Sequence, residues 1–282
     1  MELHTWNVTE AALPPKTNQI WLENPEVKEQ HPLPQRYFMK LAYRGGPFHG
    51  WQSQPNAVSV QSEIENALQT VLRKETKITG AGRTDTGVNA RVMYAHLDIN
   101  LPGAMSVERL VTALNRLVGR DIAIYSLTPV AKDAHARFDA TSRTYKYFIS
   151  LNKNPFLYPL SWQATCQLDV DAMNKASEIL LSISDFTSFA KLHSDAKTNI
   201  CKVTRADWKK NDNFLVFTIT ADRFLRNMVR AVVGTLVDVG RHKISIDDFK
   251  KIIEAKDRCA AGTSMPPEGL FLWDITYPFI SE

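Results

Sequence analysis

The most informative part of the sequence is the glycine-rich stretch Gly80-Ala81-Gly82-Arg83-Thr84-Asp85-Thr86-Gly87-Val88-Asn89-Ala90, which separates two apolar segments. Glycine adopts positive φ angles and lets other groups approach the backbone closely, so this composition predicts a tight loop that displays the side chains between its glycines. Arg83 and Asp85 carry the charges. A positioned, ionised carboxylate can act as a nucleophile or base. Taken alone, the stretch is at least as typical of a surface turn in which the aspartate caps its own backbone.

The composition of the chain limits its class. It has 282 residues, 44% of them apolar, which suits one or two domains with a sizeable core. No apolar run is long enough to cross a bilayer, and no N-terminal stretch has the order of a signal peptide. The cysteines Cys166, Cys201 and Cys259 are odd in number and widely spaced, which favours a reduced cytoplasmic protein over a disulfide framework.

The charge balance is weak evidence for a nucleic-acid partner. The chain has 34 basic and 30 acidic residues, for a net charge of +4. Only a local cluster of cations could therefore mark a nucleic-acid-binding surface. His49, His96 and His135 show no ligand spacing, so we expect no metal site.

Hydrophobic periodicity predicts alternating strands and helices. Strand patterns cover residues 36–43, 92–99, 122–130, 144–151, 203–208, 214–221 and 270–277. Helical spacing follows the candidate caps Ser59, Ser106, Asp169 and Ser245 and also covers residues 224–239. Residues 209–213 read as the turn of a hairpin, and the spacing of the elements is uneven. These patterns favour an α+β fold with a largely antiparallel sheet over a doubly wound fold.

Residues 1–35 differ from the rest of the chain. They hold five prolines and show no sustained period, which predicts an N-terminal extension that is flexible or draped on the surface.

Six blocks of the sequence together match the motifs of one protein family. Residues 82–90 are similar to the signature G-R-T-D-x-G-V-H-A and depart from it at Asn89, where the signature has His. The other five blocks are Gly50-Trp51-Gln52, Arg137-Phe138, Arg143-Thr144-Tyr145-Lys146-Tyr147, Met228-Val229-Arg230 with Val233-Gly234, and Pro266-Pro267-Glu268-Gly269-Leu270. In residues and order these blocks resemble the tRNA pseudouridine synthase A family, and the resemblance spans residues 36 to 278.

This resemblance implies a fold and an activity. The fold would be two ferredoxin-like halves that share one continuous, largely antiparallel sheet, with helices on one face and a basic cleft between the halves. Residues 36–140 would form the half with the Asp85 loop, and residues 141–282 the half with Tyr145 and the Arg230 helix. The activity would be the isomerisation of uridine to pseudouridine in the anticodon stem-loop of tRNA, at positions 38 to 40. The enzyme would be a homodimer that grips one tRNA with both subunits and needs no cofactor and no metal.

The resemblance also assigns catalytic residues. Asp85 would be the catalytic carboxylate and act as a nucleophile, although the sequence leaves open whether it attacks the base, attacks the sugar or abstracts a sugar proton. Tyr145 would stack on the uracil and accept the C5 proton, with Tyr147 as the fallback, since a phenol offers both a stacking face and a polar end. An ordinary core aromatic is the alternative for Tyr145. Arg230 would pair with Asp85.

Further residues are candidates for substrate binding. Arg223, Arg226 and Arg230 are spaced i, i+3 and i+7, the first directly before the predicted helix 224–239 and the other two within it, which would make one basic stripe for tRNA phosphates. The resemblance suggests that Arg83 helps to displace the target base, which costs a few kcal/mol of stacking. It also suggests that Leu270 packs beneath the base, where a buried strand leucine is the alternative.

Three other functions stay open at this point. A pure RNA-binding module is one, because ferredoxin-like halves overlap with RNA-recognition folds. A pseudouridine synthase that acts at another tRNA position is the second. The third is a nucleoside-cleaving enzyme, although such enzymes usually need two flanking carboxylates and Asp85 has no acidic neighbour in its loop.

Overall fold

The computed structural model describes residues 34–103, 105–191, 197–211 and 214–280. The predicted extension, residues 1–35, lies outside these ranges except for its last two residues, and Gln35 already belongs to the first strand.

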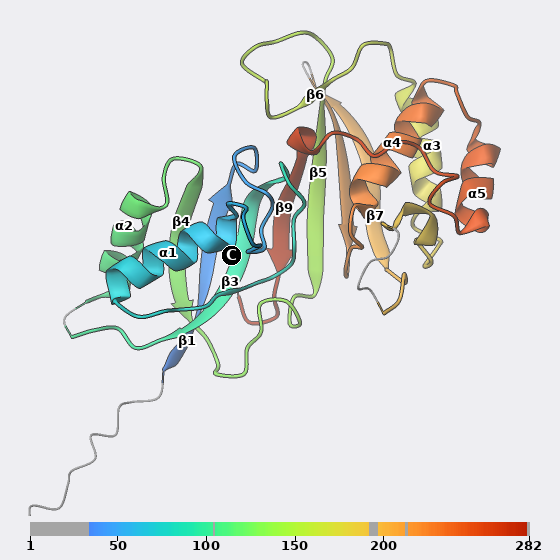
Figure 1. Cartoon of the computed structure of the whole chain (residues 1–282). Coiled ribbons are helices and arrows are strands. Elements are labelled where there is room, and N and C mark those ends of the chain that lie inside the picture. The colour runs from blue at the N-terminus through green and yellow to red at the C-terminus, as the bar shows by residue number, and fades with distance from the viewer. Residues whose placement is uncertain (1–33, 104, 192–196, 212–213, 281–282) are drawn as a thin grey trace, which may run out of the picture. The chain divides into compact units, whose positions relative to one another are not determined.

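The described residues form an α+β fold with one large mixed sheet (Figure 1). The strands are β1 (Gln35–Tyr43), β2 (Thr79–Gly80), β3 (Asn89–Ile99), β4 (Ile122–Pro129), β5 (Ser142–Ser150), β6 (Trp162–Gln163), β7 (Val203–Asn211), β8 (Phe214–Ala221) and β9 (Leu270–Thr276). The helices are α1 (Val60–Leu72), α2 (Val107–Leu117), α3 (Val170–Ile179), α4 (Met228–Gly240) and α5 (Ile246–Ala255), with 3-10 turns η1 (Thr187–Phe189) and η2 (Pro267–Gly269).

The sheet runs in the order β4-β1-β3-β9-β5-β8-β7, with β2 on β3 and β6 on β5. Most neighbours are antiparallel, as the sequence predicted. The exception on the main path is a short parallel ladder between β3 and β9, in which Asn89 pairs with Phe271 and Ala90 with Leu272. This ladder makes the sheet continuous across its middle.

Two buried clusters form the core. One gathers apolar residues of β1, β3, β4, α1 and α2, and the other gathers residues of β5, β7, β8, α3, α4 and α5. Figure 1 shows α1 and α2 beside the β4–β1–β3 end of the sheet and α3, α4 and α5 beside the β7 end. Tyr145 touches both clusters and lies where they meet.

Helix capping explains why four of the helices begin where they do. Ser59, Ser106, Asp169 and Ser245 each accept a hydrogen bond from a backbone N–H of the first turn, which satisfies a donor that the helix cannot. All four predicted caps are confirmed.

The fifth helix begins later than the sequence predicted. The apolar and basic spacing of residues 224–239 predicted a helix that includes Arg226, but α4 starts at Met228. Asn227 adopts φ 64°, a left-handed conformation that cannot continue a right-handed helix into the preceding residues. Arg223 and Arg226 therefore lie in the loop before α4. The predicted helical stripe of Arg223, Arg226 and Arg230 is wrong.

The hairpin of the second half is confirmed. β7 and β8 pair antiparallel, from Val203 opposite Ala221 to Asn211 opposite Phe214, and β7 extends three residues past the predicted end at Trp208.

Among the described residues, no helix combines the length and apolar character that crossing a membrane requires.

Candidate active site

The Asp85 loop (residues 81–88) joins β2 to β3 and is held by the end of β1 and the segment that follows it. The Tyr43 hydroxyl and the Thr84 hydroxyl are 2.8 Å apart and buried. The backbone N–H of Trp51 donates to the Thr84 carbonyl at 3.2 Å. Gly50 has φ +87°, and a Cβ there would lie 2.5 Å from the same carbonyl, so only glycine lets the two segments come this close. Thr84 is thus fixed directly before the catalytic candidate.

The other end of the loop is closed by a turn and by η2. The Val88 N–H donates to the Asp85 carbonyl at 3.1 Å. Gly87 has φ +79°, and a Cβ there would meet the ring of Pro267 at 2.8 Å. The loop therefore lies between the segment after β1 and the turn before β9, which fixes the backbone on both sides of Asp85.

Two guanidinium groups lie around the Asp85 carboxylate. Arg226 Nε is 3.7 Å from Oδ1, and Arg230 Nη1 is 3.8 Å from Oδ2. These are ion pairs beyond hydrogen-bonding distance. The exposed fraction is 26% for the Asp85 side chain, 20% for Arg230 and 60% for Arg226. The carboxylate is thus flanked by positive charge and still reachable from solvent.

Arg230 is the more firmly held of the two arginines. Its Nε donates to the Met265 carbonyl at 2.6 Å, and the Met265 N–H donates to the Arg230 carbonyl at 3.0 Å. Arg230 also lies on α4, whereas Arg226 lies on the preceding loop. A planar guanidinium with one N–H already fixed presents its remaining N–H groups in a set direction.

Tyr145 lies next to this ion-paired group. Its ring packs edge-on against Phe224 with centroids 5.0 Å apart. Burial raises the pKa of Tyr145 to about 12, Arg143 opposes the rise and the charge of Asp85 adds to it. Tyr147, the fallback, is fully buried and donates its hydroxyl hydrogen to the Pro266 carbonyl at 2.9 Å. Of the two tyrosines, Tyr145 is the one beside the carboxylate.

The remaining sequence candidates lie at different places. Arg83 is exposed on the Asp85 loop. Leu270 is buried, pairs with Tyr147 across the sheet and belongs to the second core cluster. Arg223 lies near Cys201, whose thiol pKa is raised to about 12 by burial, a rise that the Arg223 charge opposes. The structure therefore brings Arg226, Arg230 and Tyr145 to Asp85.

Sequence reasoning missed the pairing of Arg226 with Asp85, because it placed Arg226 on a helix that faces phosphates. The position of Arg226 outside the helix depends on the left-handed conformation of Asn227. An asparagine in a helical pattern is only a weak signal that the helix begins after it.

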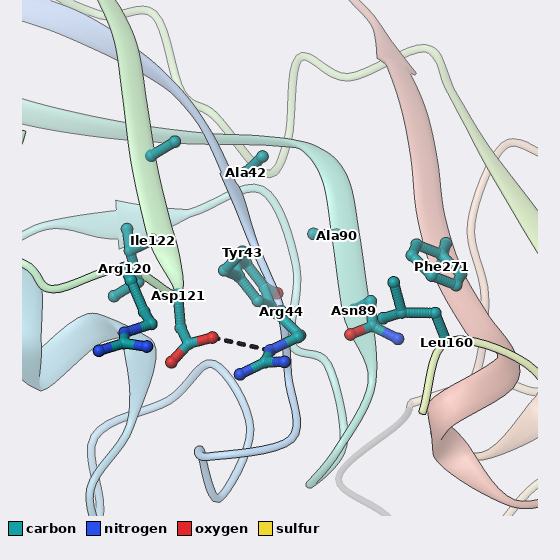
Figure 2. Close-up of a pocket in the computed structure, with 11 residues that line it drawn as sticks. Ala42, Tyr43, Arg44, Asn89, Ala90, Arg120, Asp121, Ile122, Leu160 and Phe271 are labelled. Carbon is teal, nitrogen blue, oxygen red and sulfur yellow. Dashed lines mark hydrogen bonds and ion pairs between the residues drawn. The ribbon is translucent and has the colours of Figure 1, made fainter. Parts of the chain in front are cut away.

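A pocket of about 250 Å³ lies elsewhere, at the ends of β1, β3 and β4 (Figure 2). Arg44 and Asp121 form an ion pair of 2.7 Å at its edge, and Asn89, Leu160 and Phe271 close its other side. None of the candidate site residues lines it. Within the described ranges, no group of three or more His, Cys, Asp or Glu could hold a metal ion.

Comparison with known proteins finds a matching family model and several similar proteins. A family model described as tRNA pseudouridine synthase matches residues 179–278. The chain is 54% identical over 243 residues to tRNA pseudouridine synthase A of Parabacteroides distasonis, covering 86% of this chain and 96% of that protein. It is 54% identical over 245 residues to the protein of that name from Bacteroides fragilis, with coverage of 86% and 97%. Identity to the Bacillus subtilis protein of that name is 36% over 241 residues, with coverage of 84% and 97%.

These likenesses extend over nearly the full length of each relative, and they define the chain as an isomerase that modifies RNA. More particularly, the chain belongs to the tRNA pseudouridine synthase A family, and its reaction is the formation of pseudouridine in tRNA.

Proposed function

We propose that this protein isomerises uridine to pseudouridine in the anticodon stem-loop of tRNA, at positions 38 to 40. One feature supports this most directly: the Asp85 carboxylate lies between the guanidinium groups of Arg226 and Arg230, on a loop whose backbone is fixed at both ends. Tyr145 lies beside it. The choice of the anticodon stem-loop rests on the resemblance of the sequence blocks.

The chemistry of the reaction fits this set of side chains. The bond between C1′ and N1 breaks, the uracil turns, and a bond forms between C1′ and C5. The C5 proton is lost and N1 gains one, so atoms and electrons balance without an external oxidant or reductant. The reaction therefore needs a carboxylate that reaches the nucleotide, groups that hold the detached base, and a route for one proton.

In this proposal Asp85 acts as the catalytic carboxylate. Its three possible roles, attack on the base, attack on the sugar and removal of a sugar proton, all require an oxygen that touches the nucleotide. An exposed fraction of 26% allows that contact. Arg230, fixed by Met265, would hold the carboxylate in one direction during the reaction.

The remaining candidates would bind the substrate. Tyr145 would stack on the uracil, and Leu270 would pack beneath it. A nucleotide in a stem must leave its stack before chemistry can occur, and Arg83 would fill the vacated space. Arg223 and Arg226 would contact tRNA phosphates from the loop before α4, which supports affinity more than sequence choice.

We also propose that the enzyme works as a homodimer in the cytoplasm and that one tRNA contacts both subunits. The family resemblance supports this assembly. Sedimentation of the protein alone and with tRNA would test it, because a monomer in both states would contradict the proposal.

One assay tests the proposed function. The protein is incubated with tRNAs that carry C5-tritiated uridine at a single candidate position, and tritium release is followed. We expect release from tRNAs labelled at position 38, 39 or 40 and none from a tRNA labelled only outside the anticodon stem-loop. Release only from the control tRNA would favour a synthase of another position. Tight binding without release from any tRNA would favour the RNA-binding module.

A further inference from the structure

Arg143 is a charged residue close to the candidate site, and no role was predicted for it from the sequence. We propose that Arg143 is a positioning residue for the reaction, because its guanidinium ties the Asp85 loop to the loop that carries Arg226. This inference rests on the proposed role of Asp85.

Arg143 makes four hydrogen bonds, all to backbone carbonyls. Its Nη2 donates to the Ala81 carbonyl at 3.3 Å and to the Arg137 carbonyl at 2.6 Å. Its Nη1 donates to the Ala140 carbonyl at 3.0 Å and to the Asp222 carbonyl at 2.7 Å.

These four carbonyls belong to three separate segments. Ala81 opens the Asp85 loop. Asp222 opens the Arg226 loop (residues 222–227), directly after β8. Arg137 and Ala140 belong to the connection between β4 and β5. One side chain therefore joins both loops that contribute charge to the candidate site, and anchors them to a third segment.

The position of Arg143 on the sheet explains how it reaches all three. Arg143, Tyr145 and Tyr147 alternate along β5 and so point to the same face of the sheet. Arg143 pairs with Ala221, the last residue of β8, which brings the start of the Arg226 loop next to it. It lies two residues along the strand from Tyr145, close enough for its charge to act on that hydroxyl.

The bonds of Arg143 need an arginine. Burial lowers the pKa of Arg143 from its ordinary value, so the cation has given up hydration. Carbonyl dipoles replace that hydration. A guanidinium spreads five N–H groups over a rigid plane, whereas a lysine ammonium presents three from a single point. Lysine would retain the charge at this site and lose the span between the loops.

The consequence concerns the geometry around Asp85. Asp85 and Arg226 lie on different loops, and their separation of 3.7 Å depends on how those loops are held. A displacement of about 1 Å in a reacting group can cost about a hundredfold in rate. Loss of the Arg143 connection should therefore slow the chemical step far more than it weakens binding, because Arg223 and Arg226 keep their charges and can still reach phosphate from a less constrained loop.

The test compares Arg143→Lys with a matched control, Arg36→Lys. Arg36 is also a largely buried arginine that joins segments, through Asp98 at 2.7 and 2.8 Å and the Ala134 carbonyl at 3.1 Å. Single-turnover tritium release, filter binding of tRNA and thermal unfolding are measured for both variants. Arg143→Lys should lower the single-turnover rate about a hundredfold and leave the tRNA Kd within about threefold. Arg36→Lys should leave both the rate and the Kd within about threefold of wild type, even if its Tm falls as much as that of Arg143→Lys.

A second readout reports positioning without any need for turnover. Amide hydrogen exchange of the full protein should speed up at residues 81–88 and 222–227 in Arg143→Lys and stay unchanged in β1. If Arg143→Lys is not folded at the assay temperature, Arg143→Gln is measured at a temperature where circular dichroism shows the native state. It should show the same pattern, since an amide can reach two carbonyls at most.

A double-variant experiment separates positioning from general stability. Arg226→Ala should also lower the single-turnover rate at saturating tRNA, because it removes one of the charges beside Asp85. Combined with Arg226→Ala, Arg143→Lys should lower that rate less than the product of the two single effects, because both act on the same pair of charges. The inference would be overturned if the effects of Arg143→Lys and Arg226→Ala multiply in full. It would also be overturned if the rate of Arg143→Lys stays within threefold of wild type, or if Arg143→Lys and Arg36→Lys lose rate equally. Unchanged exchange at both loops would overturn it too. Wild-type protein that releases no tritium would contradict the proposed function alone, because exchange would still decide the role of Arg143.

Discussion

The Asp85 carboxylate lies 3.8 Å from the Arg230 guanidinium, although the two residues come from opposite sides of the short β3–β9 ladder. Asp85 precedes β3, which belongs to the first core cluster, and Arg230 lies on α4, which belongs to the second. The ion pair therefore forms only when both parts of the sheet are assembled. Few side chains set the geometry of this ion pair, so single substitutions should affect tRNA binding and the rate of the reaction to different extents.

The first prediction concerns Asp85→Asn. The amide keeps the shape of the carboxylate, so the Asp85 loop should fold and tRNA should bind within a few fold of wild type, or more tightly, because Arg226 and Arg230 become free to meet phosphate. The amide cannot act as a carboxylate nucleophile or base. Single-turnover tritium release should therefore fall by more than a hundredfold, about 2.8 kcal/mol of barrier. A smaller loss, with tRNA still bound on filters, would show that Asp85 is not the catalytic residue.

The second prediction separates the two arginines around Asp85. Arg230→Ala removes a guanidinium that Met265 fixes, and leaves that carbonyl without a donor. Its single-turnover rate should fall at least tenfold, about 1.4 kcal/mol. Arg226→Ala removes a side chain that is 60% exposed, so it should weaken tRNA binding and lower the slope of log affinity against log salt by about 0.7 to 0.9.

Filter binding at several salt concentrations checks the second half of this prediction. An unchanged slope for Arg226→Ala would place that loop away from the RNA. Lys132 is exposed on the β4–β5 connection, and Lys132→Ala serves as the control that keeps the total charge change equal.

The third prediction concerns pH. The pKa of Tyr145 is raised to about 12, mainly by burial, so its phenol is neutral throughout the neutral range. If the phenolate took the C5 proton in the slowest step, the rate would rise about tenfold for each pH unit up to that pKa. The family resemblance implied that Tyr145 accepts the C5 proton, but with this pKa the phenolate is scarce at neutral pH, so we expect Tyr145 to act through its ring and its neutral hydroxyl instead. The single-turnover rate should change less than about threefold from pH 6.5 to 9.5.

The Tyr145→Phe variant is the control for the pH series. It retains the ring and should bind tRNA within about threefold of wild type. A steep rise of the wild-type rate with pH that disappears in Tyr145→Phe would show that the phenolate is the reacting form.

The sequence predicted the elements well and the site only in part, for physical reasons. Helix caps such as Ser59 and Asp169 act within one turn, so their effect is local and can be read from sequence. The predicted start of α4 was wrong because Asn227 adopts a left-handed conformation that local spacing does not specify. The proximity of Asp85 and Arg230 came from the family resemblance. The four carbonyls around Arg143 could not be predicted, because backbone acceptors have no sequence signal.

The last prediction concerns Asn89, where the family signature has His. Asn89 is 2% exposed, and its side-chain oxygen accepts from the Gly45 N–H at 2.8 Å. Its side-chain nitrogen donates to the Glu268 carbonyl at 2.8 Å and lies 3.4 Å from the Leu270 carbonyl. One amide thus joins the segment after β1 to the turn before β9, at the ladder where the sheet becomes continuous.

Asn89→Leu should therefore lower the free energy of unfolding by about 2 to 4 kcal/mol, because two buried backbone groups lose their partners. Urea unfolding at pH 7 measures this, and Asn152→Leu, at an exposed position, should change it by less than about 0.5 kcal/mol. Asn89→His should behave differently from Asn89→Leu. A neutral imidazole has one acceptor and one donor, so it can bond Gly45 and Glu268 and give up only the long contact with Leu270. We expect its single-turnover rate to stay within tenfold of wild type. A rate gain of more than tenfold would mean that asparagine holds this loop in a less active geometry than histidine does. A loss of unfolding free energy as large as that of Asn89→Leu would mean that both amide donor bonds are required.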